Sequence, residues 1–243
     1  MAQPLIMGGT GFVGRTVVTA AMAQGHDVTL FNRGSQSMAG TVQLLADRND
    51  ADQMAAALTG RQFDALLDTN CYTGAQAQAL VTALADRTRR AVMISTAAVY
   101  SDEAALPPDA RLPIGGASVW GSYGADKSAA EHVYRAAGFD HCALLRPPYI
   151  FGPGNSGDRE TWFWTRHLAG KPVILPGDGQ TRVQFLHVGD LAALILRLAG
   201  SDRTGLDIFN VADPETLSFA HLSSLLARIA DVPDQRRSAG EAA

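Results

Sequence analysis

The sequence predicts an α/β fold built around a parallel, doubly wound sheet. Strand-like and helix-like segments alternate over residues 1–146, and the strand-like runs are short and apolar with little inside-outside alternation. A glycine-rich turn at Gly8–Gly14 joins the first of these runs to a helix. Strands that are covered on both faces and joined through helices form a sheet whose ligand crevice lies at their carboxyl ends.

The predicted elements follow one another in a regular order. Short apolar runs predict strands, and apolar residues at helical spacing between them predict helices. In chain order these are a strand at Pro4–Met7, a helix at Phe12–Gln24, strands at Asp27–Phe31 and Val42–Ala46, a helix at Ala51–Thr59, a strand at Phe63–Thr69, a helix at Ala75–Ala85, a strand at Ala91–Thr96, a helix at Tyr123–Ala137 and a strand at His141–Leu145.

The glycine turn has the residues that a dinucleotide pyrophosphate requires. Gly8 permits a tight turn, Gly11 lets the backbone approach the phosphates, and Gly14 lets the helix pack against the strand. The free N–H groups of the first helical turn then face the anion. We therefore assign residues 1–146 to a dinucleotide-binding core, with cofactor contacts from Gly8, Thr10, Gly11, Phe12, Val13 and Gly14.

Beyond Arg146 the pattern loosens. Turn-rich segments at Gly152–Gly157 and Pro176–Gly179 flank a helix rich in aromatic residues, shorter strands follow, and a further helix is predicted at Phe219–Ile229. Residues 147–243 are expected to form a mixed region that holds a small substrate lobe and the last elements of the core.

The end of the second strand bears on which dinucleotide binds. Folds of this kind that use NAD usually place an acidic residue there, whereas this chain has Asn32-Arg33-Gly34. Arg33 is free to pair with a 2′-phosphate through a charge-assisted hydrogen bond worth about 1.5–3 kcal/mol. A solvated surface arginine is the alternative. The sequence favours NADP, leaves NAD possible, and adds Asn32 and Arg33 to the cofactor site.

The chemistry is expected from the fifth strand and the helix that follows it. Tyr123 and Lys127 lie four residues apart on a helix, so their side chains share one face. An ammonium favours the phenolate, which then exchanges a proton with the substrate oxygen while hydride passes to or from the nicotinamide. Thr96, with Ser95 as a second candidate, hydrogen-bonds that oxygen, and Lys127 also holds the nicotinamide ribose. The alternative is a packed Tyr123 and a surface pair between Lys127 and Glu131.

The composition narrows the classes of function. The chain has 243 residues, 47% of them hydrophobic, with a formal charge of −4 and no basic run, so nucleic acid is not an expected partner. Two cysteines are too few for a disulfide framework. There is no signal peptide and no apolar run of about 18 residues, so a soluble, cytoplasmic protein is expected. No group of side chains has metal-ligand spacing, and no metal is expected.

Several segments together resemble the extended short-chain dehydrogenases/reductases, the NAD-dependent epimerase/dehydratase family. The resemblance extends to about Asp231. Phe31–Gly34 and Asp47–Asp50 are similar to a branch that includes the chloroplast stem-loop-binding proteins and reductase-like relatives. Besides the glycine turn, the family segments are Ser95–Tyr100, Tyr123–Lys127, Arg146–Asn155, Pro176–Gly179, Phe185–Asp190 and Phe209–Val211.

The resemblance implies a Rossmann fold and a set of site residues. Thr96, Tyr123 and Lys127 fall on the catalytic positions of the family. Asp47 falls where an acid meets the adenine, with Arg48 beside it in the cofactor site, and Asn70 lies at the end of the fourth strand next to the cofactor. The family also implies a homodimer packed through the helices at 75–85 and 123–137.

Two departures from the family concern the substrate. Nucleotide-sugar epimerases carry an arginine two residues before the aromatic residue of their Phe-x-His-Val stretch, and that position here is Val183. Arg182 should face the other side of the strand, unless a one-residue bulge turns it toward the substrate. Tyr149, after the sixth strand, is a further substrate candidate. Relatives continue for tens of residues past Ile229, so part of the usual substrate wall is expected either to be missing or to be contributed by something else.

Three functions remain open from the sequence. The first is an NAD(P)-dependent oxidoreductase acting on a secondary alcohol or ketone of a small polar or natural-product substrate. The second is a sugar epimerase or dehydratase, although Ala97-Ala98 stands where dehydratases often carry an acid pair. The third is a cofactor-binding or RNA-binding protein without catalysis, against which the negative charge and the Tyr-Lys pair argue. The substrate and the direction of reaction are not predicted.

Overall fold

The computed structural model describes residues 1–104, 109–157 and 159–239. The chain forms two compact units, and each combines two stretches of sequence. The first contains Met1–Pro148 and Val188–Val211, and the second contains Tyr149–His187 and Ala212–Ala243. The last elements of the core are thus a separate stretch, residues 188–211, that returns to the first unit after the chain has built most of the second.

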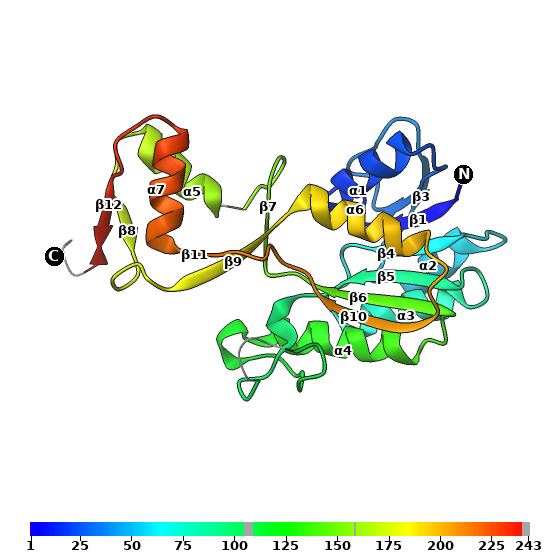
Figure 1. Ribbon diagram of the computed structural model, residues 1–243. Coiled ribbons are helices and arrows are strands. Elements are labelled where there is room, and N and C mark those ends of the chain that lie inside the picture. Colours follow the sequence, from blue (N-terminus) through cyan, green and yellow to red (C-terminus); the bar gives the residue numbers. More distant parts are fainter. Residues whose placement is uncertain (105–108, 158, 240–243) are drawn as a thin grey trace. The chain divides into compact units, whose positions relative to one another are not determined.

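The first unit is built on a seven-stranded parallel sheet in the order β10-β6-β5-β4-β1-β2-β3 (Figure 1). From β1 the chain adds β2 and β3 on one side, and then β4, β5, β6 and β10 on the other. The order therefore reverses between β1 and β4, where sheets of this type bind ligands. The strands are β1 (Pro4–Met7), β2 (Thr29–Asn32), β3 (Val42–Leu45), β4 (Ala65–Asp68), β5 (Arg90–Ile94), β6 (His141–Arg146) and β10 (Gly205–Asn210).

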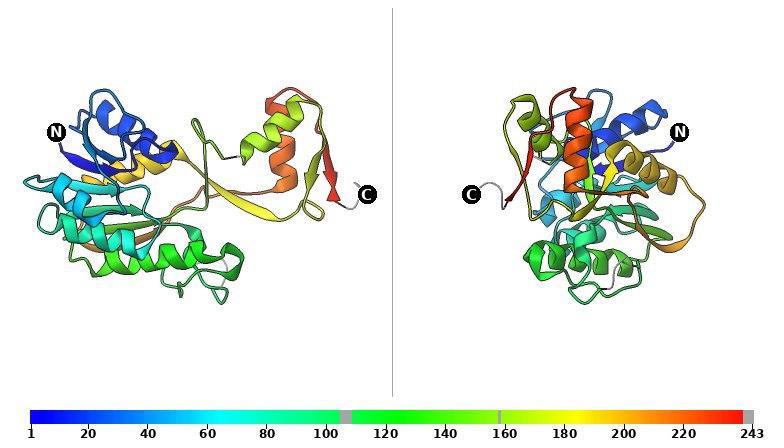
Figure 2. Two further views of the ribbon diagram at one scale, coloured as in Figure 1. Left: turned by 180° about the vertical axis from the view of Figure 1, so that it is seen from behind. Right: turned by 60° about the vertical axis from the view of Figure 1, so that its left-hand side comes forward.

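Helices cover both faces of this sheet, which confirms the predicted doubly wound α/β fold. On one face α1 (Phe12–Ala23) packs beside α6 (Val188–Ala199), and the other face carries α2 (Ala51–Leu58), α3 (Gly74–Leu84) and α4 (Ser122–Ala136) (Figures 1 and 2). Side chains from the second group of helices, among them Met54, Leu80 and Tyr134, form a buried core with Leu5, Leu66 and Leu144 of the strands.

The sequence explains where these elements lie. All residues of β1, β4 and β6 are buried, so their strands read as continuous apolar runs rather than alternating ones. Side-chain caps set the starts of two helices: Asp50 accepts hydrogen bonds from the amides of Asp52 and Gln53 before α2, and Thr73 accepts one from Gln76 before α3. For this reason α3 begins at Gly74, one residue before the predicted start.

The second unit is smaller and mixed. Its three-stranded sheet has the order β11-β9-β7, with β9 (Arg182–His187) parallel to β7 (Tyr149–Phe151) and antiparallel to β11 (Thr216–Ser218). Helices α5 (Glu160–Leu168) and α7 (Phe219–Ile229) pack together next to a parallel pair formed by β8 (Val173–Leu175) and β12 (Arg236–Ser238) (Figure 1). The core of this unit contains Phe163, Val173, Leu175, Leu222 and Leu226.

Candidate cofactor-binding and catalytic site

A pocket of about 410 Å³ opens at the carboxyl ends of β1, β2 and β4, at the point where the strand order reverses. Its position in the first unit is the one that the glycine turn predicts. The pocket is lined by the predicted cofactor residues Gly8, Thr10, Gly11, Asn32, Arg33, Asp47, Arg48 and Asn70, and also by Met7, Phe31, Ser35, Ala46, Asn49, Tyr72 and Gln76, which the sequence did not single out.

The three glycines of the turn meet different surroundings. Gly8 has φ +77° and lies against the Asn70 side chain, so its conformation and its lack of a Cβ are both required. A Cβ on Gly14 would overlap the carbonyl oxygen of Gly8. A Cβ on Gly11 would meet protein no closer than 3.7 Å, so its own fold leaves room for a side chain there. Because Gly11 lines the pocket and has no side chain, a ligand in the pocket can come close to its backbone.

The start of α1 adds to the suitability of the turn for an anion. Gly11 is the N-cap of the helix, has no capping side chain, and is followed by Phe12, Val13 and Gly14, with no acidic residue in the first turn. The first amides of a helix have no partner within it and form the positive end of its dipole. The amides of α1 are therefore available to a pyrophosphate at the pocket.

Two cations lie near the end of β2. Asn32 shapes the turn, because its Oδ1 accepts a hydrogen bond of 2.8 Å from the amide of Gly34, and Arg33 lines the pocket. From α1, Arg15 donates to Gln36 Oε1 at 2.9 Å and to the Thr10 carbonyl at 3.2 Å, which brings a second guanidinium to this turn. Sequence reasoning missed Arg15, although it directly follows the glycine motif.

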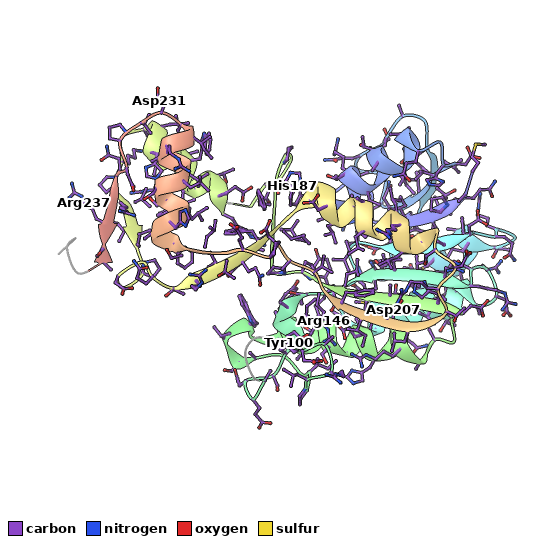
Figure 3. The ribbon with its side chains drawn as sticks, viewed as in Figure 1. Tyr100, Arg146, His187, Asp207, Asp231 and Arg237 are labelled. Atoms are coloured by element: carbon purple, nitrogen blue, oxygen red, sulfur yellow. The ribbon has the colours of Figure 1, made fainter. Side chains whose placement is uncertain are left out.

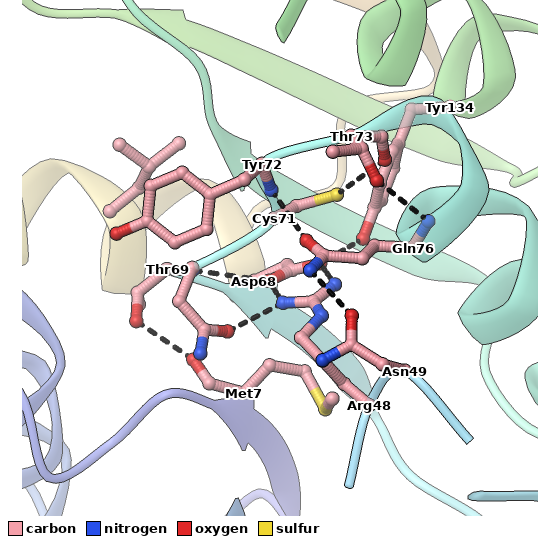
Figure 4. A network of polar contacts seen from close by, with 12 residues as sticks. Met7, Arg48, Asn49, Asp68, Thr69, Cys71, Tyr72, Thr73, Gln76 and Tyr134 are labelled. Carbon is pink, nitrogen blue, oxygen red and sulfur yellow. Dashed lines mark hydrogen bonds and ion pairs between the residues drawn. The ribbon is translucent and has the colours of Figure 1, made fainter. Parts of the chain in front are cut away.

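Arg48 lies in the pocket wall, but its charge faces the protein interior. Its Nη1 and Nη2 donate to the two carboxylate oxygens of Asp68, each at 3.0 Å, and Tyr134 donates to the same carboxylate at 2.6 Å (Figure 4). Nη1 also donates to Asn70 Oδ1. Arg48 thus lines the pocket, as expected from the sequence, and its guanidinium pairs with Asp68 and holds Asn70 in the pocket wall.

The electrostatics of Asp68 follow from this pairing. Burial disfavours its charged form, but the Arg48 guanidinium and the hydrogen bonds from Arg48 and Tyr134 outweigh burial and hold the pKa of Asp68 below its usual range. The sequence placed neither Asp68 nor Tyr134 in the site, because a partner 20 residues from Arg48 has no signature in the local pattern.

Lys127 connects α4 to the pocket wall. It is buried on α4, and its Nζ donates to the carbonyl oxygens of Cys71 and Ile94, both at 2.6 Å. Cys71 lies between the pocket residues Asn70 and Tyr72, and the ammonium is 5.8 Å from the centroid of the Tyr72 ring. Burial lowers the pKa of Lys127 to about 8. The alternative surface pair with Glu131 does not form.

Glu131 instead belongs to a second buried network that anchors α4. Its carboxylate accepts hydrogen bonds from Ser95 Oγ at 2.6 Å and from Arg146 Nε and Nη2 at 2.9 and 2.7 Å. Arg146 also donates to the Tyr100 hydroxyl at 3.1 Å (Figure 3). Ser95 is thus buried and serves the packing of α4 rather than a substrate, which corrects the expectation that it contacts one.

The other two predicted catalytic residues are Thr96, which follows β5, and Tyr123, which lies in the first turn of α4. Thr96 is half-buried and caps the short helix η1 (Ala97–Val99), where its Oγ1 accepts a hydrogen bond of 3.2 Å from the Ala98 amide. Tyr123 is 40% exposed, and Lys127, one turn later, is 4% exposed. A Cβ on Gly124 would overlap the Ala98 carbonyl, so the start of α4 lies tightly against η1. The three predicted catalytic residues therefore come from adjoining segments of the first unit.

The two substrate candidates of the second unit differ in placement. Tyr149 lines an apolar cavity within that unit. Arg182 instead donates from Nε and Nη2 to the hydroxyl and carbonyl oxygens of Thr216, both at 2.6 Å. The strand pairs of β9 are in regular register, so no bulge occurs, and it is Val183 that lines the cavity. Arg182 therefore faces the other side of the strand, as its position predicted, and the bulge that would turn it toward a substrate is absent from β9.

The part of the chain that the structure describes contains neither a candidate metal site nor a helix that could cross a membrane. Over residues 1–104, 109–157 and 159–239, no three His, Cys, Asp or Glu side chains gather in a way that suits a metal ion. Within the same ranges, none of the helices combines the length and the apolar character needed to cross a bilayer.

Comparison with known proteins identifies relatives along nearly the whole chain. The chain is 29% identical over 249 positions to the chloroplast stem-loop binding protein of 41 kDa b from Arabidopsis thaliana, a match that covers 95% of this chain and 64% of that protein. It is 28% identical over 231 positions to the 2′-dehydrokanamycin reductase of Streptomyces kanamyceticus, covering 90% of this chain and 64% of the relative. The chain thus spans slightly less than two thirds of the length of these relatives.

A solved structure shows the same fold. The dTDP-glucose 4,6-dehydratase of Bacillus anthracis, determined in complex with NAD, has a TM-score of 0.83 at 15% identity, covering 98% of this chain and 84% of that one. The model of the family described as NAD dependent epimerase/dehydratase matches residues 4–212. This match covers the glycine turn, the reversed strand order and the Tyr-Lys helix, and the chain belongs to the NAD dependent epimerase/dehydratase family.

Proposed function

We propose that this protein is an NADP-dependent oxidoreductase that transfers hydride between the nicotinamide and a secondary alcohol or ketone of a small polar or natural-product molecule. The observation that carries the proposal is the attachment of Lys127 to two carbonyl oxygens beside the pocket wall, those of Cys71 in the loop after β4 and of Ile94 at the end of β5. Tyr123 precedes it by one helical turn and is exposed. A fixed cation thus lies beside the wall of a pocket suited to a dinucleotide, with a phenol one helical turn before it on the same helix.

The residues of the pocket suit the adenosine and pyrophosphate parts of the cofactor. The bound dinucleotide supplies hydride chemistry at its nicotinamide ring. Gly11 and the amides of α1 suit the pyrophosphate, and Asp47, which also lines the pocket, is the residue that we expect to meet the adenine. Arg33 and Arg15 favour a 2′-phosphate, because the end of β2 has no carboxylate that would repel it. These two cations are the reason for preferring NADP to NAD.

Tyr123 and Lys127 divide the work of proton transfer. In the direction of reduction, the Tyr123 hydroxyl gives its proton to the substrate carbonyl oxygen as hydride reaches the carbon. The Lys127 ammonium, fixed by two carbonyl oxygens, favours the phenolate that remains. The Thr96 hydroxyl donates a hydrogen bond to the same substrate oxygen. In the direction of oxidation the phenolate takes the proton back.

Epimerisation of a nucleotide sugar is a second reaction that Tyr123 and Lys127 could catalyse, and the residues of β9 favour it less. A nucleoside diphosphate carries several negative charges, and a cation on β9 would be needed to bind them. Val183 is apolar at the position where epimerases of the family are expected to carry arginine, and Arg182 is bonded to Thr216. This arrangement supports net reduction or oxidation over epimerisation.

The test is a measurement of net cofactor turnover. The full chain is incubated with NADPH and a panel of ketones, and the absorbance of the reduced nicotinamide is followed. The proposal expects net oxidation of NADPH by at least one ketone, and a slower rate with NADH. Isomerisation of a UDP-sugar without net change in the cofactor would replace the proposal by an epimerase, and salt-sensitive RNA binding without turnover would replace it by a binding protein.

A further inference from the structure

The second unit contains an apolar cavity of about 220 Å³ with an unusual wall. All of its lining residues belong to that unit. Val183 and Leu222 contribute aliphatic side chains, and Arg159 is the one charged residue among the described residues that line it. The rest of the wall is aromatic and comes from β7, α5, β9 and α7: Tyr149, Trp162, Phe163, Phe185 and Phe219.

The aromatic rings hold one another in place. Phe163 stacks on Phe219 with ring centroids 6.3 Å apart and planes 12° apart, and Trp162 meets Phe163 edge to face at 5.0 Å. In the part of the wall that the strands form, the ring centroids of Tyr149 and Phe185 are 6.0 Å apart. Aromatic pairs in these arrangements are mutually attractive, so the cavity is formed before a ligand arrives. Its faces and edges suit a flat ring.

The size of the cavity limits what it holds. An apolar protein cavity of about 150 Å³ takes up benzene. At about 220 Å³ the present cavity has room for one six-membered aromatic ring with a short substituent. A nucleoside with two phosphates is larger than this and much more polar than the wall. The cavity therefore selects for a single ring.

Arg159 favours a negatively charged substituent on the bound ring. Its guanidinium carbon is 5.3 Å from the centroid of the Tyr149 ring, and Nη1 donates to the Ile150 carbonyl at 3.0 Å. In the described part of the chain no acidic side chain pairs with it, and a guanidinium has five N–H donors in a fork that matches a carboxylate. One cation at the edge of an apolar cavity is suited to one negative charge.

We propose that this cavity recognises a monocyclic aromatic carboxylate, with the ring between the aromatic side chains and the carboxylate on Arg159. The proposed binding site depends only on residues of the second unit. The substrate class that it implies, an aromatic acid that carries a ketone or a secondary alcohol, also rests on the proposed function. The experiment below separates the two.

The first measurement is calorimetric titration of the full chain with benzoate, with benzamide as the uncharged ring of the same shape, and with UDP. Benzoate should bind at least about tenfold more tightly than benzamide, which corresponds to one charge-assisted hydrogen bond. Arg159→Gln should abolish this preference. Arg228→Gln, which removes an exposed cation on α7 outside the cavity, is the matched control and should preserve it.

The second measurement locates the bound ring. The chain has three tryptophans, and the indole N–H signal that disappears in Trp162→Phe should be the one that benzoate shifts in a ¹H–¹⁵N spectrum. Val183→Trp, which fills the cavity, should prevent the shift. Equal binding of benzoate and benzamide, benzoate binding that persists in both Arg159→Gln and Val183→Trp, or tighter binding of UDP than of benzoate would overturn the proposal.

The turnover assay then tests the binding site separately from the substrate class. Benzoate binding with the expected charge preference, but without NADPH oxidation by any aromatic keto acid, would contradict the proposed function and leave the binding site standing. NADPH oxidation by ketones at rates that are indifferent to an aromatic carboxylate and to Arg159→Gln would support the proposed function and overturn the substrate class.

Discussion

Arg48 and Asp68 form a two-point ion pair behind the wall of the dinucleotide pocket, with both nitrogen–oxygen distances at 3.0 Å. Arg48 is 8% exposed and Asp68 is fully buried. Because the same guanidinium also donates to Asn70, which lines the pocket, the pair fixes part of the cofactor site through the end of β4. Tyr134 extends this connection to α4, the helix of Tyr123 and Lys127.

The first prediction concerns the cost of separating this pair. Arg48→Met leaves a buried carboxylate without its partner and should lower the free energy of unfolding by about 3–5 kcal/mol. The double variant Arg48→Met with Asp68→Leu removes both charges and should be more stable than the single one. Urea unfolding of the wild type, both single variants and the double variant gives the coupling energy. A loss below about 0.5 kcal/mol in Arg48→Met would show that the pair does not stabilise the fold.

The second prediction concerns acid stability. The pKa of Asp68 in the folded protein lies below the ordinary value of 3.8, so as the pH falls the unfolded state takes up the proton first. The stabilisation from this group is therefore complete above about pH 5 and is lost as the pH falls through the folded-state pKa. Unfolding free energies measured across this range should fall less steeply in Asp68→Asn than in the wild type. Asp202→Asn, at an exposed position, is the control and should keep the wild-type slope.

The third prediction separates two glycines of the turn. Gly11 has room for a methyl group within the protein, so Gly11→Ala should change stability by less than about 1 kcal/mol while weakening NADPH about tenfold or more. Gly14→Ala places a methyl group against the Gly8 carbonyl and should cost about 1–3 kcal/mol of stability as well as binding. Thermal unfolding and cofactor titration measure both quantities. Unchanged NADPH affinity in Gly11→Ala would place the pyrophosphate elsewhere.

The fourth prediction concerns the choice of cofactor. Arg33→Ala should weaken NADP binding about tenfold or more and leave NAD binding nearly unchanged, because only NADP carries the 2′-phosphate that the guanidinium would pair with. Arg15→Ala should act in the same direction. Dissociation constants for both dinucleotides, measured by fluorescence or calorimetry, decide the matter. Equal losses for NAD and NADP would remove the basis for the preference.

Much of the fold could be predicted from local sequence because the first unit follows local rules. Strands buried on both faces are visible as apolar runs, and the glycine turn predicts a pocket at the carboxyl ends of the strands, where the structure has one. The start of α3 differed by one residue because a threonine cap decides it. The helix at Phe219–Ile229 lies where the sequence placed it. These features depend on neighbours within a few residues.

The features that the sequence did not predict concern side chains whose partners are distant in sequence. Ser95 was predicted to face a substrate, but Glu131, 36 residues later, accepts its hydroxyl. Arg48 lines the pocket as expected, but the sequence did not show that its guanidinium pairs with Asp68. A motif shows that a polar side chain is present near a site, whereas the direction in which it points depends on long-range packing. The homodimer and the cytoplasmic location stay predictions.

The measurement that tests the central claim most directly is the turnover of Tyr123→Phe at saturating NADPH, with cofactor affinity measured in parallel. The account predicts an unchanged NADPH dissociation constant and a rate that falls by about a hundredfold or more, because the phenylalanine keeps the ring and removes only the proton donor. Wild-type turnover in Tyr123→Phe would contradict the account.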